Sequence, residues 1–145
     1  MSKNYGHNSQ VLKQFQQDPV VIDIEQQNDV CVLRCRGRFV AGRYVGYMHA
    51  KMEEIKRLQC RSVVADFCEV PSIGSTGINF IVGLHTWVNR KPGGRFVLAG
   101  AGPFIQRVLD LTRLSAVLPM TEDLPSGLTA LRGAARMANS KATAY

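Results

Sequence analysis

Short apolar runs alternate with amphipathic stretches along the middle of the chain. Two β-branched runs, Val20–Ile24 and Val30–Cys35, flank the turn-prone residues 26–29 and predict a β-hairpin. The nearly continuous apolar run Ser62–Phe67 is typical of a central strand. Two further runs, Arg95–Ala99 and Ala116–Leu118, predict additional short strands.

The segments between these runs have helical periodicity, with apolar residues at three- and four-residue steps. They predict four helices, over residues 44–58, 75–90, 103–111 and 122–137. The third helix begins at Pro103, and four residues supply its apolar side: Phe104, Val108, Leu109 and Leu111.

The helix that begins at Ser75 has more apolar surface than one buried face needs. Its two apolar stripes are Ile78, Ile81, Val82 and His85, and Phe80, Leu84, Trp87 and Val88. One stripe is expected to pack on the sheet. The other is either covered by the helix from Pro103 or partly exposed for a partner, with Trp87 as the anchor.

Strands that alternate with helices in this order predict an α/β fold. We expect a mixed sheet of about five strands, opened by an antiparallel hairpin and flanked by about four helices. Residues 18–137 form the expected single domain. Residues 1–17 are expected to form a flexible arm, and residues 138–145 a frayed tail.

Composition narrows the range of functions. No apolar run approaches the roughly 20 residues of a membrane span, and the N-terminus has no secretory apolar core, which predicts a cytoplasmic protein without membrane insertion. The net charge is +7, but the basic residues are scattered singly or in pairs such as Lys56-Arg57 and Arg90-Lys91. This pattern argues against a nucleic-acid partner and favours an acidic protein partner.

The four cysteines, Cys31, Cys35, Cys60 and Cys68, have no C-x-x-C spacing and lie in apolar surroundings. We therefore expect buried thiols, with no disulfide framework in a reducing compartment and no metal site. No cofactor-binding loop and no nucleophile with its activating base is found, so the sequence does not predict an enzyme.

One continuous segment resembles the signature of STAS domains. It reads Val63-Val64-Ala65-Asp66-Phe67-Cys68-Glu69-Val70-Pro71-Ser72-Ile73-Gly74-Ser75-Thr76-Gly77-Ile78. The family pattern is an apolar strand, Asp, a short loop with Val, and Ile-Asp-Ser-Ser-Gly-Leu at the start of a helix. Leu33–Phe39, Arg95–Leu98 and Arg107–Leu114 resemble flanking family motifs, so the similarity covers roughly residues 18 to 135.

The resemblance implies an anti-sigma factor antagonist. In such proteins, a serine kinase that doubles as an anti-sigma factor phosphorylates the hydroxyl residue at the helix start, and a phosphatase can reverse the change. By position this residue is Ser75, with Thr76 as the alternative. The implied partner contacts are Gly74, Ser75, Thr76, Gly77, Asn79, Phe80 and Trp87. Oligomeric state is left open, a homodimer included.

Two positions depart from the family pattern: Gly74 replaces the Asp before the phosphorylated hydroxyl, and Arg113 replaces a Gly. The first departure leaves open an altered kinase, a domain held in one state, or a relative that binds without being switched. The alternative functions are a non-switching STAS scaffold of a stress-signalling assembly and an accessory STAS subunit of a lipid transporter.

Local chemistry also leaves alternatives at the helix start. With Gly74 in the place of a capping Asp, the hydroxyl of Ser75 or Ser72 is expected to cap the helix instead. Asp66, at the end of its strand, either orients the loop before Ser75 or caps its own loop.

Overall fold

The computed structural model describes residues 19–40 and 44–132. The expected arm and tail, and the final part of the last predicted helix, therefore lie outside the described residues. In the described part, β1 (Val21–Gln27) and β2 (Val30–Arg36) pair antiparallel from Val21↔Arg36 to Gln27↔Val30. The intervening Asn28 has φ of 57°, a left-handed conformation that Asn tolerates well in turns. The predicted hairpin is confirmed.

Within the described residues, the sheet has five strands in the order β1-β2-β3-β4-β5. β3 (Ser62–Glu69), β4 (Phe96–Ala99) and β5 (Met120–Thr121) run parallel to β2. The mixed α/β sheet with an opening antiparallel hairpin is therefore as predicted.

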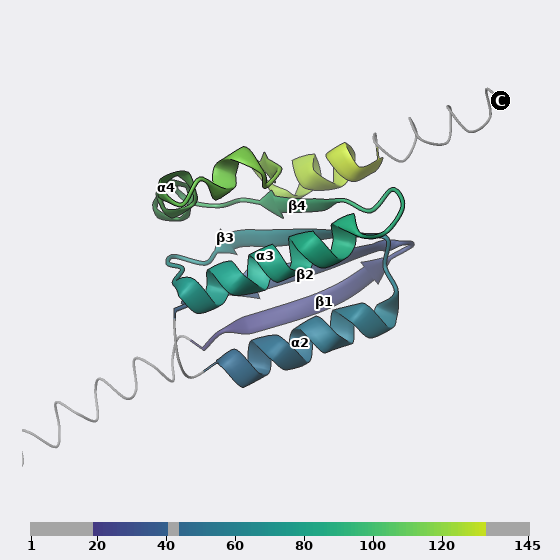
Figure 1. The fold of residues 1–145 in the computed structure, drawn as a ribbon, viewed down its shortest axis with the longest axis horizontal. Coiled ribbons are helices and arrows are strands. Elements are labelled where there is room, and N and C mark those ends of the chain that lie inside the picture. Colours follow the sequence, from purple (N-terminus) through teal and green to yellow (C-terminus); the bar gives the residue numbers. More distant parts are fainter. Residues whose placement is uncertain (1–18, 41–43, 133–145) are drawn as a thin grey trace, which may run out of the picture.

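Helices connect the parallel strands. α2 (Val45–Leu58) precedes β3, α3 (Ser75–Asn89) precedes β4, and α4 (Pro103–Leu111) precedes β5. A 3-10 helix (Leu114–Ala116) follows α4, and a last helix is described over residues 124–132. In Figure 1, α2 and α3 lie side by side in front of the sheet, and α4 lies at one end of it.

Strand alternation divides the apolar residues between two cores. The larger core lies between the sheet and helices α2, α3 and α4, and contains Cys31, Leu33, Val63, Ala65, Phe67, Phe96 and Leu98. The alternate strand residues Val32, Val64, Val97 and Ala99 point to the other face, where Leu131 of the last helix covers them. Successive side chains of a strand point to opposite faces, which explains why these central strands are apolar throughout.

Two expectations for the region after β4 are wrong. The last strand is Met120–Thr121 and not Ala116–Leu118, because the chain forms a 3-10 turn there and the Leu118 N–H donates to the Leu114 carbonyl oxygen at 2.9 Å. The apolar side of α4 also differs, since Ile105 and Leu109 are its buried residues and Phe104 and Leu111 are exposed.

The neighbour expected for α3 is also wrong. α2 and not α4 is the main helix beside it, and the Met52 Cε atom of α2 lies 3.1 Å from the position that a Cβ at Gly83 would take. The glycine therefore permits close packing of α2 against α3. Phe80, Leu84 and Val88 of the second stripe are buried in the larger core, and so is Ile81 of the first stripe.

The expectation of four buried thiols is wrong for three cysteines. Cys31 and Cys60 form a disulfide with a Cα–Cα distance of 5.8 Å, and Cys68 is an exposed thiol. Cys35 alone is the buried free thiol that was expected, and its burial raises the pKa of the thiol. The pair was missed because 29 residues separate its members, which become neighbours only when β2 and β3 pair.

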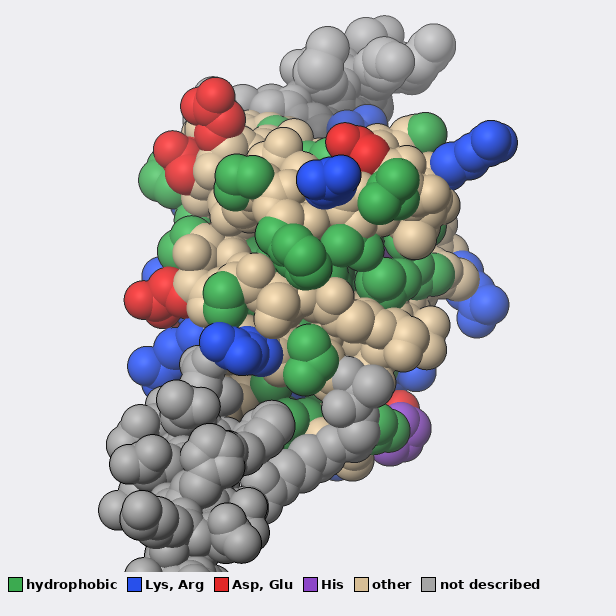
Figure 2. Space-filling view, turned by 90° about the vertical axis from the view of Figure 1, so that its left-hand side faces the viewer, with side chains coloured by type: hydrophobic (Ala, Val, Ile, Leu, Met, Phe, Trp, Pro, Cys, Tyr) green, Lys and Arg blue, Asp and Glu red, His purple; other side chains and the backbone are tan. Residues whose placement is uncertain are grey.

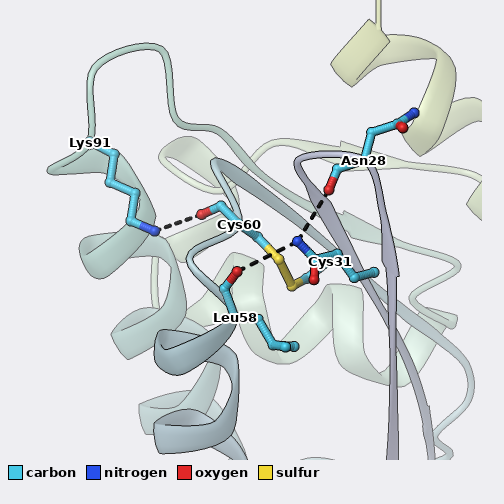
Figure 3. The surroundings of a disulfide bond; sticks show 6 residues. Asn28, Cys31, Leu58, Cys60 and Lys91 are labelled. Carbon is cyan, nitrogen blue, oxygen red and sulfur yellow. Dashed lines mark hydrogen bonds between the residues drawn. A yellow bond between two sulfur atoms is a disulfide. The ribbon is translucent and has the colours of Figure 1, made fainter.

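Figure 3 shows the disulfide at the end of the sheet where β2 and β3 begin. The Lys91 ammonium donates a hydrogen bond to the Cys60 carbonyl oxygen at 2.6 Å, and the Gln26 side chain donates to the Leu58 carbonyl oxygen at 3.5 Å. These contacts join the hairpin and the ends of α2 and α3 at one end of the domain.

Candidate functional site

The segment that leads to Ser75 is held by backbone hydrogen bonds to the chain that follows β2. The Phe39 N–H donates to the Ser72 carbonyl oxygen at 3.0 Å, and the Gly74 N–H donates to the Phe39 carbonyl oxygen at 2.7 Å. Phe39 and Ile73 thereby form an isolated parallel bridge, and both side chains are buried. This bridge sets the position at which α3 begins.

Gly74 is the N-cap residue of α3, with extended backbone at φ −122° and ψ −167°. The expected capping by Ser75 or Ser72 is wrong, because no side chain makes a capping hydrogen bond there. The first bond of the helix runs from the Ile78 N–H to the Gly74 carbonyl oxygen at 2.9 Å. Within residues 19–40 and 44–132, no acceptor is found for the N–H groups of Ser75, Thr76 and Gly77.

The start of α3 is therefore electropositive. Unpaired N–H groups and the helix dipole together place a partial positive charge at this end. The first turn contains no acidic residue to offset it. The Ser75 hydroxyl is exposed at this position, and Asn79, one turn later, is exposed on the same side.

Gly77 and Phe80 lie in the interior, so they do not offer side chains to a partner. A Cβ at Gly77 would lie 2.7 Å from both the Phe39 carbonyl oxygen and the Ile73 Cγ1 atom. Phe80 is 5% exposed, and its ring lies 6.3 Å from that of Phe39. Both residues hold the first turns of α3 against the bridge. Phe39 belongs to a motif noted in the sequence, but no positioning role was predicted for it.

Trp87 is not close to Ser75. It lies twelve residues along the same helix, about 18 Å away. Its ring is half-buried, and the Lys91 ammonium lies 3.6 Å from the ring centroid in a cation–π contact. Partial burial also lowers the pKa of Lys91. The structure thus brings Gly74, Ser75, Thr76 and Asn79 together, and places Trp87 at the other end of α3.

Asp66 lies inside β3 and not at the end of its strand, because β3 continues to Glu69. Its Oδ1 atom accepts a hydrogen bond from the N–H of Cys68, which also belongs to β3, at 3.1 Å. Loop capping by Asp66 is therefore not observed. Desolvation, followed by the hydrogen bond to Asp66, raises the pKa of the Cys68 thiol. The cysteine is exposed, but a raised pKa lowers the fraction of thiolate, which is the nucleophilic form.

No group of three or more His, Cys, Asp or Glu side chains with metal-binding geometry occurs in the described part of the chain. None of the described helices is both long and apolar enough to cross a membrane. The chemistry available at the start of α3 is thus an exposed hydroxyl in an electropositive setting.

Known proteins resemble the chain in sequence and in structure. The anti-sigma F factor antagonist of Paenibacillus polymyxa is 26% identical over 111 residues, which cover 76% of this chain and 93% of the relative. An anti-sigma factor antagonist from Mycobacterium paratuberculosis superimposes with a TM-score of 0.70 at 21% identity, covering 79% of this chain and 96% of that one.

The phosphorylated form of the Bacillus cell fate determinant SpoIIAA has a TM-score of 0.55 at 17% identity, over 70% of this chain and 91% of that one. Because both solved structures are less than 25% identical to this chain, they establish the fold alone. The STAS domain family model matches residues 21–127. The chain belongs to the STAS domain family.

Proposed function

We propose that the chain is an anti-sigma factor antagonist that binds a serine kinase acting as an anti-sigma factor, and that phosphorylation of Ser75 ends this binding. The observation that carries the proposal is the exposed Ser75 hydroxyl at the uncapped start of α3. The name of the Paenibacillus relative supports the general role, and the phosphorylated SpoIIAA structure supports a phosphorylation cycle on this fold.

The proposed transfer needs only the hydroxyl from this chain. The Ser75 Oγ atom attacks the γ-phosphorus of ATP bound to the kinase, an Oγ–P bond forms, and the bond to the β-phosphate oxygen breaks to release ADP. The hydroxyl proton passes to a base of the kinase. A phosphatase would hydrolyse the phosphoserine and restore the first state.

The phosphate would act on the interface more than on the fold. It adds a charge of about −1.5 to −2 at a helix end that attracts anions. The N–H groups of Ser75, Thr76 and Gly77 have no competing acceptor in the described ranges, so they are available to the phosphate oxygens. A partner seated closely on Ser75 and Asn79 would meet this new charge and bulk directly.

Gly74 affects this step in two ways. It supplies no carboxylate beside the phosphate, which removes one repulsion, and it supplies no capping side chain, which leaves the helix end open. We therefore favour a switchable domain over one held permanently in a single state. We also propose that the protein acts in the cytoplasm by binding a partner, without turnover of its own.

Phosphopeptide mass spectrometry tests the proposal directly. The full chain is incubated with ATP and the serine kinase that co-purifies with it from its own cells, and Ser75→Ala is compared with Thr76→Ala. We expect phosphate on Ser75 in the wild type and in Thr76→Ala, and its loss in Ser75→Ala. With an active kinase present, the absence of phosphate between residues 72 and 76 would contradict the switch and favour constitutive binding.

A further inference from the structure

Basic side chains gather at the end of the domain that lies opposite to Ser75. Helices α2 and α3 both end there, and strands β3 and β4 both begin there (Figure 1). Figure 2 views the other end, where α3 begins, and shows basic, acidic and hydrophobic side chains interspersed. We call the cluster where the two helices terminate the basic end, and its members are Lys56, Arg57, Arg61, Arg90, Lys91 and Arg95.

Hydrogen bonds hold the segments of the basic end together. The Arg95 N–H donates to the Ser62 hydroxyl oxygen at 3.1 Å, and the Lys91 ammonium donates to the Cys60 carbonyl oxygen at 2.6 Å (Figure 3). Arg61 lies between these two acceptor residues along the chain, and the last turn of α2 leads directly into this segment. Cations from three separate parts of the sequence therefore share one surface.

Few carboxylates offset this charge. The Arg61 Nε atom lies 3.9 Å from the Asp29 Oδ2 atom, and the Lys56 Nζ atom lies 3.6 Å from the Glu53 Oε1 atom. Both are long contacts between exposed side chains, so each pair is weak. Within residues 19–40 and 44–132, the remaining members form no ion pair: Arg57, Arg90, Lys91 and Arg95.

We propose that the basic end is a second docking surface and that its occupant is an acidic segment of a partner protein, rich in Asp and Glu. Arginine predominates among the members, and its planar guanidinium group binds a carboxylate through two parallel hydrogen bonds. Ser75 and Asn89 are the two ends of α3 and lie about 21 Å apart. The surface is thus separate from the site of the proposed phosphorylation, and both partners can bind at the same time.

Two other anionic partners fit this surface less well. The Trp87 ring is half-buried, and the Lys91 ammonium occupies one face at 3.6 Å from the centroid, so the ring does not offer an open platform for a base. A membrane surface receives apolar side chains beside basic ones. Among the described residues, none of the exposed large apolar side chains lies at this end.

Fluorescence anisotropy of a labelled deca-glutamate peptide with the full chain tests the docking surface. The wild type should bind the peptide at about 50 mM salt, and salt should weaken this binding because it screens exposed charges. The double variant Arg90→Glu/Arg95→Glu should bind at least about tenfold more weakly, since two attractions become repulsions. The control Arg36→Glu/Arg107→Glu changes the net charge equally, but its exposed arginines lie at the far end of β2 and on α4. It should bind within about threefold of the wild type, because its charges are more than a screening length from the basic end.

Emission from Trp87, the one tryptophan of the chain, reports where the peptide binds. Its ring contacts Lys91, so the peptide should change the emission of the wild type and of the control variant. Circular dichroism should show unchanged folding in all variants, because the substituted side chains are exposed. If the reversed pair does not fold, Arg90→Gln/Arg95→Gln removes the same charges without adding acidic groups and should still weaken binding. Ser75→Ala should bind the peptide like the wild type, so failure of the phosphorylation switch would not alter this result.

The proposal is overturned if the wild type does not bind the peptide at about 50 mM salt, or if the Arg90/Arg95 variants and the control lose affinity equally. Unchanged Trp87 emission on binding would place the peptide elsewhere and would also overturn it. Deca-thymidylate and phosphatidylserine vesicles are measured in parallel. If either binds more tightly than the peptide and depends on Arg90 and Arg95, the surface serves a nucleic acid or a membrane, and the acidic protein segment proposed here is wrong.

Discussion

Reduction of the Cys31–Cys60 disulfide should lower the free energy of unfolding of this domain by about 3.6 kcal/mol. The bond closes a loop of 29 residues that contains β2, α2 and the turn before β3. Loop-closure entropy for this length is about −12 cal/mol/K, which gives the stated value at 25 °C. Both cysteines are fully buried, so the reduced thiols stay in an apolar setting after the bond is cleaved.

Urea unfolding at matched pH, with and without a phosphine reductant, measures this difference. For a slope of about 2 kcal/mol/M, the unfolding midpoint should fall by just under 2 M on reduction. Trp87, the one tryptophan of the chain, reports on α3, and far-ultraviolet circular dichroism reports on the whole domain. Cys68→Ser is the control: its thiol is exposed and free, so the variant should show the same shift as the wild type.

A difference below about 1 kcal/mol between the free energies of unfolding of the oxidised and reduced proteins would refute the reasoning, because the unfolded chain would then gain little freedom on reduction.

Reduction should also leave phosphorylation of Ser75 unchanged. The disulfide lies where β3 begins and Ser75 follows the other end of this eight-residue strand, about 25 Å away.

Two further predictions concern helix starts. Gly77→Ala should lower the free energy of unfolding by about 2–3 kcal/mol in urea titrations, because the new Cβ atom would overlap the Phe39 carbonyl oxygen. Gly46→Ala in α2 is the control and should not be destabilising, because no atom lies within 4 Å of the position of its Cβ. Equal losses of stability in both variants would contradict the steric argument. Asp123 accepts the Ser126 N–H at 2.8 Å, and this bond lowers the pKa of the carboxyl group. The stabilisation of the fold by this hydrogen bond should therefore be present above the ordinary carboxyl pKa and be lost as pH falls through the lowered pKa of Asp123. An NMR titration that places the Asp123 pKa at or above 3.8 would contradict the predicted lowering.

The order of elements was predictable because each carries a strong local pattern. The hairpin, the central strand and the start of α3 at Ser75 all follow from β-branched runs, turn residues and helical periodicity. β5 was misplaced because it contains only two residues, and the apolar run before it forms a turn. A run that short contains no period from which a strand could be recognised.

Features that depend on packing were harder to predict from the sequence. The helix start and its hydroxyl were predicted from a local motif, but the burial of Phe80 and the tight contact of Gly77 with Phe39 depend on a segment 38 residues earlier. Likewise, the apolar residues of α4 did not reveal which would face the core. Ile105 and Leu109 were selected by the position of the helix relative to the sheet, which left Phe104 and Leu111 exposed.

The geometry around Ser75 bears on how a phosphate would transmit its effect. The preceding residues are bound to Phe39 on both sides of Ile73, and Gly77 leaves no space between α3 and that segment. The start of α3 is thus fixed by backbone contacts that a phosphate on an exposed hydroxyl would not break. Because the N–H groups at this end would stabilise the added charge, the helix has no physical reason to unfold or shift. Control through Ser75 would therefore operate where the surface of the partner meets the hydroxyl, by electrostatic and steric exclusion.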